Sequence, residues 1–151
     1  MAGRVGNVEI TGARGASSTR EFDPSLAGGP LRELSADSIK FTESGISVVE
    51  RHTARFGPDA ANEYMVDRLR QISRGEIEAT TVDRNFYSHE LREYVRYRQL
   101  GWEAGQPADP MAAYRLWNNT HTATLEEYRI LGPYTDKSLY HSNAINLMEG
   151  N

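Results

Sequence analysis

The sequence predicts a mainly α-helical fold, a compact bundle of about four helices preceded by an extended N-terminal arm. From residue 42 onward, apolar residues recur at helical spacing, and glycine or proline follows each periodic segment. Few stretches alternate as strands do. The length of 151 residues suits one domain with a sizeable core.

The N-terminal part has a different composition from the rest. Residues 2–40 are rich in glycine, serine, alanine and proline, with turn signals at Asp23-Pro24 and Gly28-Gly29-Pro30. The one strand signal is Val8-Glu9-Ile10. We therefore expect residues 1–41 to form a linker or arm and residues 42–151 to form the helical domain.

Four helices are expected in that domain. The first ends at Gly57-Pro58, and the second opens at Pro58 and Asp59 and is followed by Gly75. The third covers about 81–100, and the fourth covers about 110–130. The expected core positions of the first two helices are Ile46, Val49, Thr53, Phe56, Ala61, Met65, Leu69 and Ile72. A short tail follows, with Leu139, Ile145 and Leu147 as its anchors.

Composition excludes several classes of protein. The chain has no cysteine, which rules out disulfide scaffolds, thiolate zinc sites and cysteine nucleophiles. No apolar stretch approaches the length of a membrane span, so stable membrane insertion is not expected. The N-terminal residues lack the apolar segment of a secretory signal, so export would depend on a longer parent chain.

The third helix carries the first candidate site. His89, Arg92, Glu93 and Arg96 share one of its faces, and Glu90 lies on an edge expected to face protein. Histidine transfers protons near neutral pH, and arginine binds phosphate. His89 would then be an acid or base and Arg92 a phosphate anchor. The alternative is a solvated charged face with pairs one turn apart.

The fourth helix carries the second candidate site. Its segment Asn118-Asn119-Thr120-His121-Thr122-Ala123-Thr124 is unusually polar for a helix interior, and such local conflicts often mark function. His121 lies one turn from Trp117 on an aromatic stripe. A buried histidine bonded to a neighbour would explain it equally well. In the tail, His141 either completes a site or closes the fold, whereas His52 is interpreted as structural or solvated.

Metal and nucleotide motifs are absent or incomplete. His89-Glu90 begins like the zinc motif H-E-x-x-H, but Glu93 stands where the second histidine belongs. His89 and Glu93 could still hold a metal with His121 or His141 as a third ligand. Since no spacing requires this, we expect neither a metal nor a cofactor. The sequence also lacks the glycine-rich phosphate loops and the hydrolase serine motif.

Three ordered motifs resemble the C-terminal toxin domains of bacterial polymorphic toxins, including contact-dependent growth-inhibition and Rhs-type proteins. They are Asn85-Phe86-Tyr87-Ser88-His89-Glu90-Leu91-Arg92-Glu93, Asn119-Thr120-His121-Thr122-Ala123-Thr124-Leu125-Glu126-Glu127-Tyr128 and Leu139-Tyr140-His141. The resemblance covers about residues 46–145. Thr120 and Ser142 depart from the family pattern, as does a long loop between the two motif helices. Residues 22–30 resemble the junctions where such toxins join their carriers.

The resemblance implies a toxin nuclease, with ribonuclease favoured over deoxyribonuclease. It places the catalytic machinery at His89, Glu90, Glu93, His121 and His141, with Arg92 beside them. We expect substrate contacts from Arg96, Asn118, Thr120 and Tyr140. It further implies a larger carrier polypeptide, export as part of that effector, action on RNA in the target-cell cytoplasm, and a cognate immunity protein.

Two other functions fit the same residues. A non-catalytic helical module would bind a partner protein and use its histidines structurally. A metal-dependent hydrolase would use His89 and Glu93 and would lose activity with a chelator. The net charge of −4 requires any nucleic-acid site to be locally basic.

Overall fold

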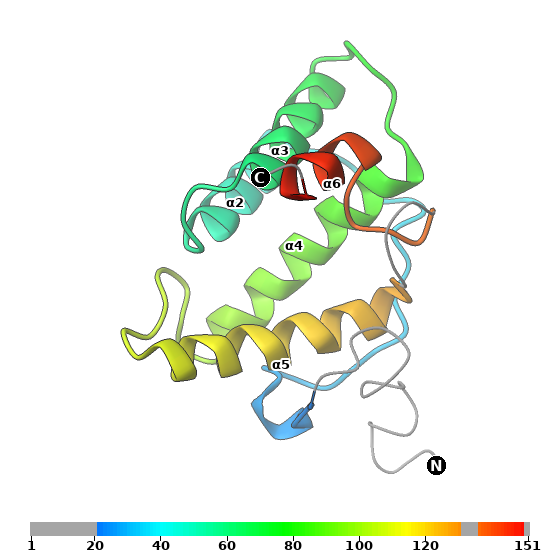
Figure 1. Ribbon diagram of the computed structural model, residues 1–151. Coiled ribbons are helices and arrows are strands. Elements are labelled where there is room, and N and C mark those ends of the chain that lie inside the picture. Colours follow the sequence, from blue (N-terminus) through cyan, green and yellow to red (C-terminus); the bar gives the residue numbers. More distant parts are fainter. Residues whose placement is uncertain (1–20, 131–135, 150–151) are drawn as a thin grey trace. The chain divides into compact units, whose positions relative to one another are not determined.

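The computed structural model describes residues 21–130 and 136–149. Within these ranges the chain forms five α-helices, one 3-10 helix and no strand, so the predicted mainly α fold is confirmed (Figure 1). The helices are η1 (Pro24–Leu26), α2 (Glu43–Ala54), α3 (Ala60–Ser73), α4 (Thr81–Gln99), α5 (Pro110–Tyr128) and α6 (Ser142–Glu149). The strand signal at 8–10 lies outside the described residues.

The helix boundaries follow from capping residues. The side chains of Thr42, Asp59 and Asp109 accept hydrogen bonds from backbone N–H groups in the first turns of α2, α3 and α5. Gly57 and Gly75 follow α2 and α3 with φ of 93° and 77°, which glycine adopts without a steric penalty. The four predicted helices therefore begin and end within a few residues of their expected positions.

The chain divides into two compact units. One unit joins the described residues 21–35 to 92–130, and the other joins 36–91 to 136–149. Helix α4 contributes its first eleven residues to the second of these units and the remainder to the first. We call them the α5 unit and the α3 unit.

The α3 unit is built on a hydrophobic core. Helix α3 packs against both α2 and α6, as Figure 1 shows. The fully buried core residues come from all four helical segments of the unit and include Ile46, Met65, Leu69, Phe86, Tyr87 and Ala144. Helix α6 was not predicted from the sequence, which indicates only a tail there. Ile145 and Leu139 are buried as predicted, but the prediction that Leu147 is an anchor is wrong because its side chain is exposed.

In the α5 unit, part of the predicted arm is packed against helix α5. Phe22 and Ala27 are buried together with Ala123, and η1 lies beside α5. The Asn118 amide donates to the backbone oxygen of Glu21 at 2.7 Å. The described part of the arm is therefore anchored to the fold by apolar packing and by polar side chains of α5.

One buried carboxylate organises the polar interior of the α5 unit. Glu127 accepts hydrogen bonds from the guanidinium groups of Arg92 and Arg96 and from the backbone N–H of Arg32. Arg96 is fully buried and also donates to the backbone oxygens of Ala27, Gly29 and Pro30. Two arginines share one carboxylate, so the cluster keeps one net positive charge.

We expect Glu127→Gln to destabilise the protein by about 3 kcal/mol, because removing one partner leaves the buried Arg96 charge uncompensated. Urea unfolding followed by circular dichroism measures the loss. Glu33→Gln is the matched control, since Glu33 pairs with Arg129 on the surface and both side chains are largely exposed. Equal losses in the two variants would contradict a central role for Glu127.

Gly28→Ala tests how closely residues 21–35 approach helix α4. Gly28 has a φ of 78°, and a Cβ there would lie 2.5 Å from the backbone oxygen of Arg96. We expect a loss of about 2 kcal/mol or more, from the left-handed backbone and the clash together. Gly101→Ala isolates the backbone effect, because Gly101 has a φ of 91° but a Cβ there would meet nothing within 4 Å. The contact is refuted if Gly28→Ala melts no lower than Gly101→Ala.

Candidate functional site

A histidine–carboxylate pair lies in the α5 unit. The Nδ1 atom of His121 on α5 is 2.9 Å from the Oε2 atom of Glu93 on α4. The Glu93 side chain is 1% exposed, and the His121 side chain is 17% exposed. A carboxylate at Nδ1 fixes the ring orientation and favours the tautomer with its proton on that nitrogen. Proton transfer to a ligand would then be the task of Nε2.

An aromatic side chain packs against the His121 ring of this pair. The ring of Trp117, one turn earlier on α5, stacks on the His121 ring with centroids 4.6 Å apart and an angle of 21° between planes. Tyr114 contacts Trp117 in turn, at 6.0 Å. The alternative prediction for His121 is a buried histidine bonded to a neighbour. The bond is present, but the side chain is only partly buried.

The predicted solvated face on α4 is wrong. His89, Glu93 and Arg96 are all buried, with at most 1% of each residue exposed. Buried charges require partners, and Glu93 and Arg96 find theirs on α5 at His121 and Glu127. Helical periodicity identifies a polar face. It does not show whether that face contacts water or side chains about 30 residues away in sequence.

Arg92, the predicted phosphate anchor, binds Glu127 with both Nε and Nη2. Its side chain is 21% exposed, whereas that of Arg96 is fully buried. The contacts of Arg96 with Glu127 and three backbone oxygens explain its position without a substrate. Substrate binding by Arg96 stays a prediction.

The polar residues of α5 chiefly serve the fold. The hydroxyl groups of Thr120 and Thr124 donate to backbone oxygens one turn earlier on the same helix. Asn119 donates to the backbone oxygen of Arg115 and accepts from the backbone N–H of Asp23. Asn118 and Thr120 are both buried. Contacts within the fold therefore explain these polar side chains without a substrate. Substrate binding by Asn118 and Thr120 stays a prediction.

A second histidine–carboxylate pair lies in the α3 unit. The Nε2 atom of His141 is 3.3 Å from Oδ1 of Asp83 and 3.1 Å from the hydroxyl oxygen of Thr80. Asp83 also receives two hydrogen bonds of 2.8 Å from the guanidinium of Arg68. A cavity of about 460 Å³ borders this cluster, lined by Thr80, Thr81, Val82, Asp136, Tyr140, His141 and Ser142.

The pKa values of Asp83 and His141 are both lowered, for different reasons. Burial alone would raise the pKa of Asp83, but hydrogen bonds from Arg68 and Thr80 and the charge of Arg68 outweigh it. Burial lowers the pKa of His141, and the attraction of Asp83 does not fully compensate. His141 is therefore favoured in its neutral form at neutral pH.

Arg68 and Thr80 were not predicted from the sequence. Thr80 and Asp83 form a capping box, in which the Asp83 side chain accepts from the Thr80 N–H and the Thr80 hydroxyl accepts from the Asp83 N–H. The spacing Thr-x-x-Asp before a helix could have revealed this pair. Arg68 lies on α3, and no local pattern connects it to Asp83.

The remaining predicted residues of the α3 unit are buried or bonded. Glu90 lies 3.7 Å from His52 and 4.0 Å from His89. His52 is fully buried, so the solvated interpretation of this residue is wrong. The Tyr140 hydroxyl donates to Asn62 at 2.7 Å in a partly buried contact. Catalytic roles for His89, Glu90 and His141, and substrate binding by Tyr140, stay predictions.

Comparison of the chain with protein-family models, curated proteins and solved structures finds no significant match. None of the helices in the described ranges is long and apolar enough to cross a membrane. Function is therefore inferred from the residues and their contacts.

Asp83→Asn tests the ionic network of the α3 unit. Because the folded pKa of Asp83 lies below its ordinary value of about 4, its stabilising contribution is complete above that pH. The contribution is lost as pH falls further, through the folded pKa. We expect Asp83→Asn to lower stability at pH 7 by about 3 kcal/mol and to flatten the acid limb of the stability curve.

Urea unfolding between pH 2.5 and pH 7 measures both effects. Glu76→Gln is the control, because Glu76 pairs with Arg74 on the surface, and its replacement should change stability little. An acid limb of unchanged slope in Asp83→Asn would contradict the assignment.

Proposed function

We propose that this chain is the nuclease domain of an interbacterial toxin and that it cleaves RNA through acid–base catalysis by His121. The observation that carries the proposal is the 2.9 Å bond between His121 Nδ1 and the buried carboxylate of Glu93. A partly accessible imidazole held by a buried carboxylate is the arrangement that proton transfer near neutral pH requires.

The chemistry needs no cofactor. In metal-independent RNA cleavage the ribose 2′-oxygen loses its proton and bonds to phosphorus, while the bond from phosphorus to the 5′-oxygen breaks. A base accepts the first proton and an acid supplies one to the leaving oxygen. His121 Nε2 would perform one of these transfers, and Glu93 would stabilise the imidazolium whenever it is charged.

A cation is also expected at the developing phosphorane charge. Arg92 immediately precedes Glu93, and its cluster with Arg96 and Glu127 retains one net positive charge. The partial exposure of Arg92 supports a role at the phosphate, although its guanidinium is also held by Glu127. We assign Arg92 as the anion-stabilising residue of the proposed site.

The biological setting of the proposal comes from the motif resemblance. The domain would reach a neighbouring bacterium as part of a larger exported effector and act in the target-cell cytoplasm. A cognate immunity protein would neutralise it in the producing cell. These motifs supply His121, Glu93 and Arg92, which are the residues of the α5 unit that the proposed chemistry uses.

His121→Ala is expected to lower the rate of RNA cleavage by the purified protein about 100-fold or more, because the proton-transfer group is lost. Glu93→Gln should reduce the rate by a smaller factor. The His121 ring keeps a polar side chain at position 93 but loses the charge that stabilises its protonated form. Cleavage of a fluorescent single-stranded RNA gives the rates, and circular dichroism checks the fold of each variant.

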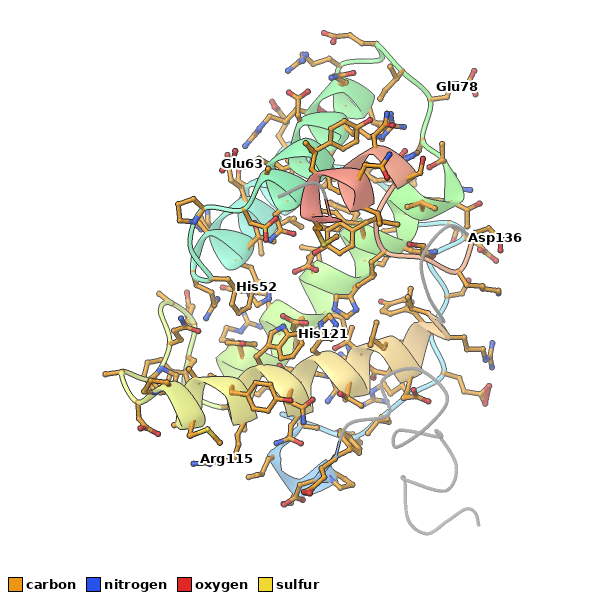
Figure 2. All side chains as sticks on the ribbon, viewed as in Figure 1. His52, Glu63, Glu78, Arg115, His121 and Asp136 are labelled. Carbon is orange, nitrogen blue, oxygen red and sulfur yellow. The ribbon has the colours of Figure 1, made fainter. Side chains whose placement is uncertain are left out.

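Glu78→Gln is the control. Glu78 is an exposed residue of the segment between α3 and α4, where Figure 2 labels its side chain, and it lies outside the proposed site. Wild-type cleavage by folded His121→Ala would refute the proposed site. Loss of wild-type activity in a chelator would instead support the metal-dependent hydrolase, and absence of any cleavage would favour the binding module.

A further inference from the structure

Three rings form a ladder along one face of α5. Tyr114, Trp117 and His121 are spaced by three and four residues, which places them on the same side of the helix. Their centroids are separated by 6.0 Å and 4.6 Å. Tyr114 is 46% exposed, and the His121 side chain is 17% exposed. The ladder therefore has an exposed outer ring, and its inner ring is the proposed reacting group.

Core packing does not explain the outer ring of this ladder. Neither Tyr114 nor Trp117 belongs to the two hydrophobic clusters of the described residues. Tyr114 borders a hollow of about 870 Å³ in the α5 unit, which is also lined by the exposed apolar side chains of Leu26 and Met111. A tyrosine ring beside exposed apolar groups offers a flat apolar surface to a planar ligand.

We propose that Tyr114 and Trp117 form a stacking platform for unpaired nucleobases, so that the RNA cleaved at His121 is single-stranded. The inference rests on the proposed function and specifies its substrate class. Unpaired bases expose their faces to aromatic side chains, whereas bases in a duplex are already covered by their neighbours. Since every base has such a face, the platform confers preference for single strands rather than for a sequence.

The charge of the chain supports stacking as the source of affinity. With 17 basic and 21 acidic residues, the protein does not attract a polyanion as a whole. The cluster around Glu127 contributes a single net positive charge. Because the salt dependence of binding reflects the number of phosphates neutralised, we expect a shallow dependence, equivalent to about one or two phosphate contacts.

Binding is measured with a fluorescently labelled, eight-nucleotide 2′-O-methyl RNA, which lacks the nucleophilic hydroxyl and stays intact with the wild-type protein. Fluorescence anisotropy gives the affinity for this single strand and for the matching duplex. We expect the single strand to bind at least tenfold more tightly than the duplex. Tyr114→Ala and Trp117→Leu should each weaken single-strand binding about tenfold, and Tyr114→Phe should retain it because the ring remains.

Met148→Ala is the control, since Met148 is a similarly exposed apolar residue on α6. Equal binding by Tyr114→Ala and wild type, a preference for the duplex, or no binding of the single strand would each overturn the platform. His121-dependent cleavage with unaltered binding by Tyr114→Ala would refute the platform but still support the nuclease. Ring-dependent binding without any cleavage would support the platform and refute the nuclease.

Discussion

The buried carboxylate of Glu127 is the constraint on which the α5 unit depends. A carboxylate out of contact with water is costly unless its charge is compensated and its lone pairs are occupied. Arg92, Arg96 and the backbone N–H of Arg32 meet this need. Arg96 must in turn satisfy its own donors, and it does so with backbone oxygens at residues 27, 29 and 30. Burial of one acidic group thus connects α4, α5 and the N-terminal segment.

The same constraint sets the position of the proposed catalytic pair. Glu127 lies six residues beyond His121 on α5, about 9 Å along the helix axis. On α4 the partners Arg92, Glu93 and Arg96 lie within little more than one turn. Fixing Glu127 between the two arginines therefore fixes the register in which Glu93 meets His121. The ion cluster acts as a positioning device, since arginine–carboxylate geometry tolerates little sliding.

Much of the fold was predictable because its signals are local. Asp59 and Asp109 mark the starts of their helices through capping, and Gly57 and Gly75 mark the ends of α2 and α3. The buried state of the α4 polar face was not predictable, because its partners at His121 and Glu127 are about 30 residues distant. Similarly, the polar residues Asn118 and Asn119 are unusual in a helix interior, and both form hydrogen bonds with residues 21–23. The sequence of α5 alone does not indicate these partners.

The two histidine–carboxylate pairs differ in what their carboxylates already bind. Asp83 receives a bidentate arginine and both donors of Thr80, so its charge is compensated without a protonated histidine. Burial lowers the pKa of His141 and the charge of Arg68 adds to that effect, so the neutral ring is favoured at neutral pH. Asp83 also accepts from the Thr80 N–H in the capping box at the start of α4, which is a structural task.

The surroundings of His121 are different, because its ring stacks on Trp117, its Nδ1 contacts Glu93, and its side chain stays 17% exposed. The ladder that begins at this ring continues through Trp117 to the exposed ring of Tyr114. A ligand that stacks on the outer ring would therefore bind on the same helix as the imidazole, two turns away. The series of three rings distinguishes the proposed RNA site from the His141 pair, whose carboxylate belongs to a helix cap.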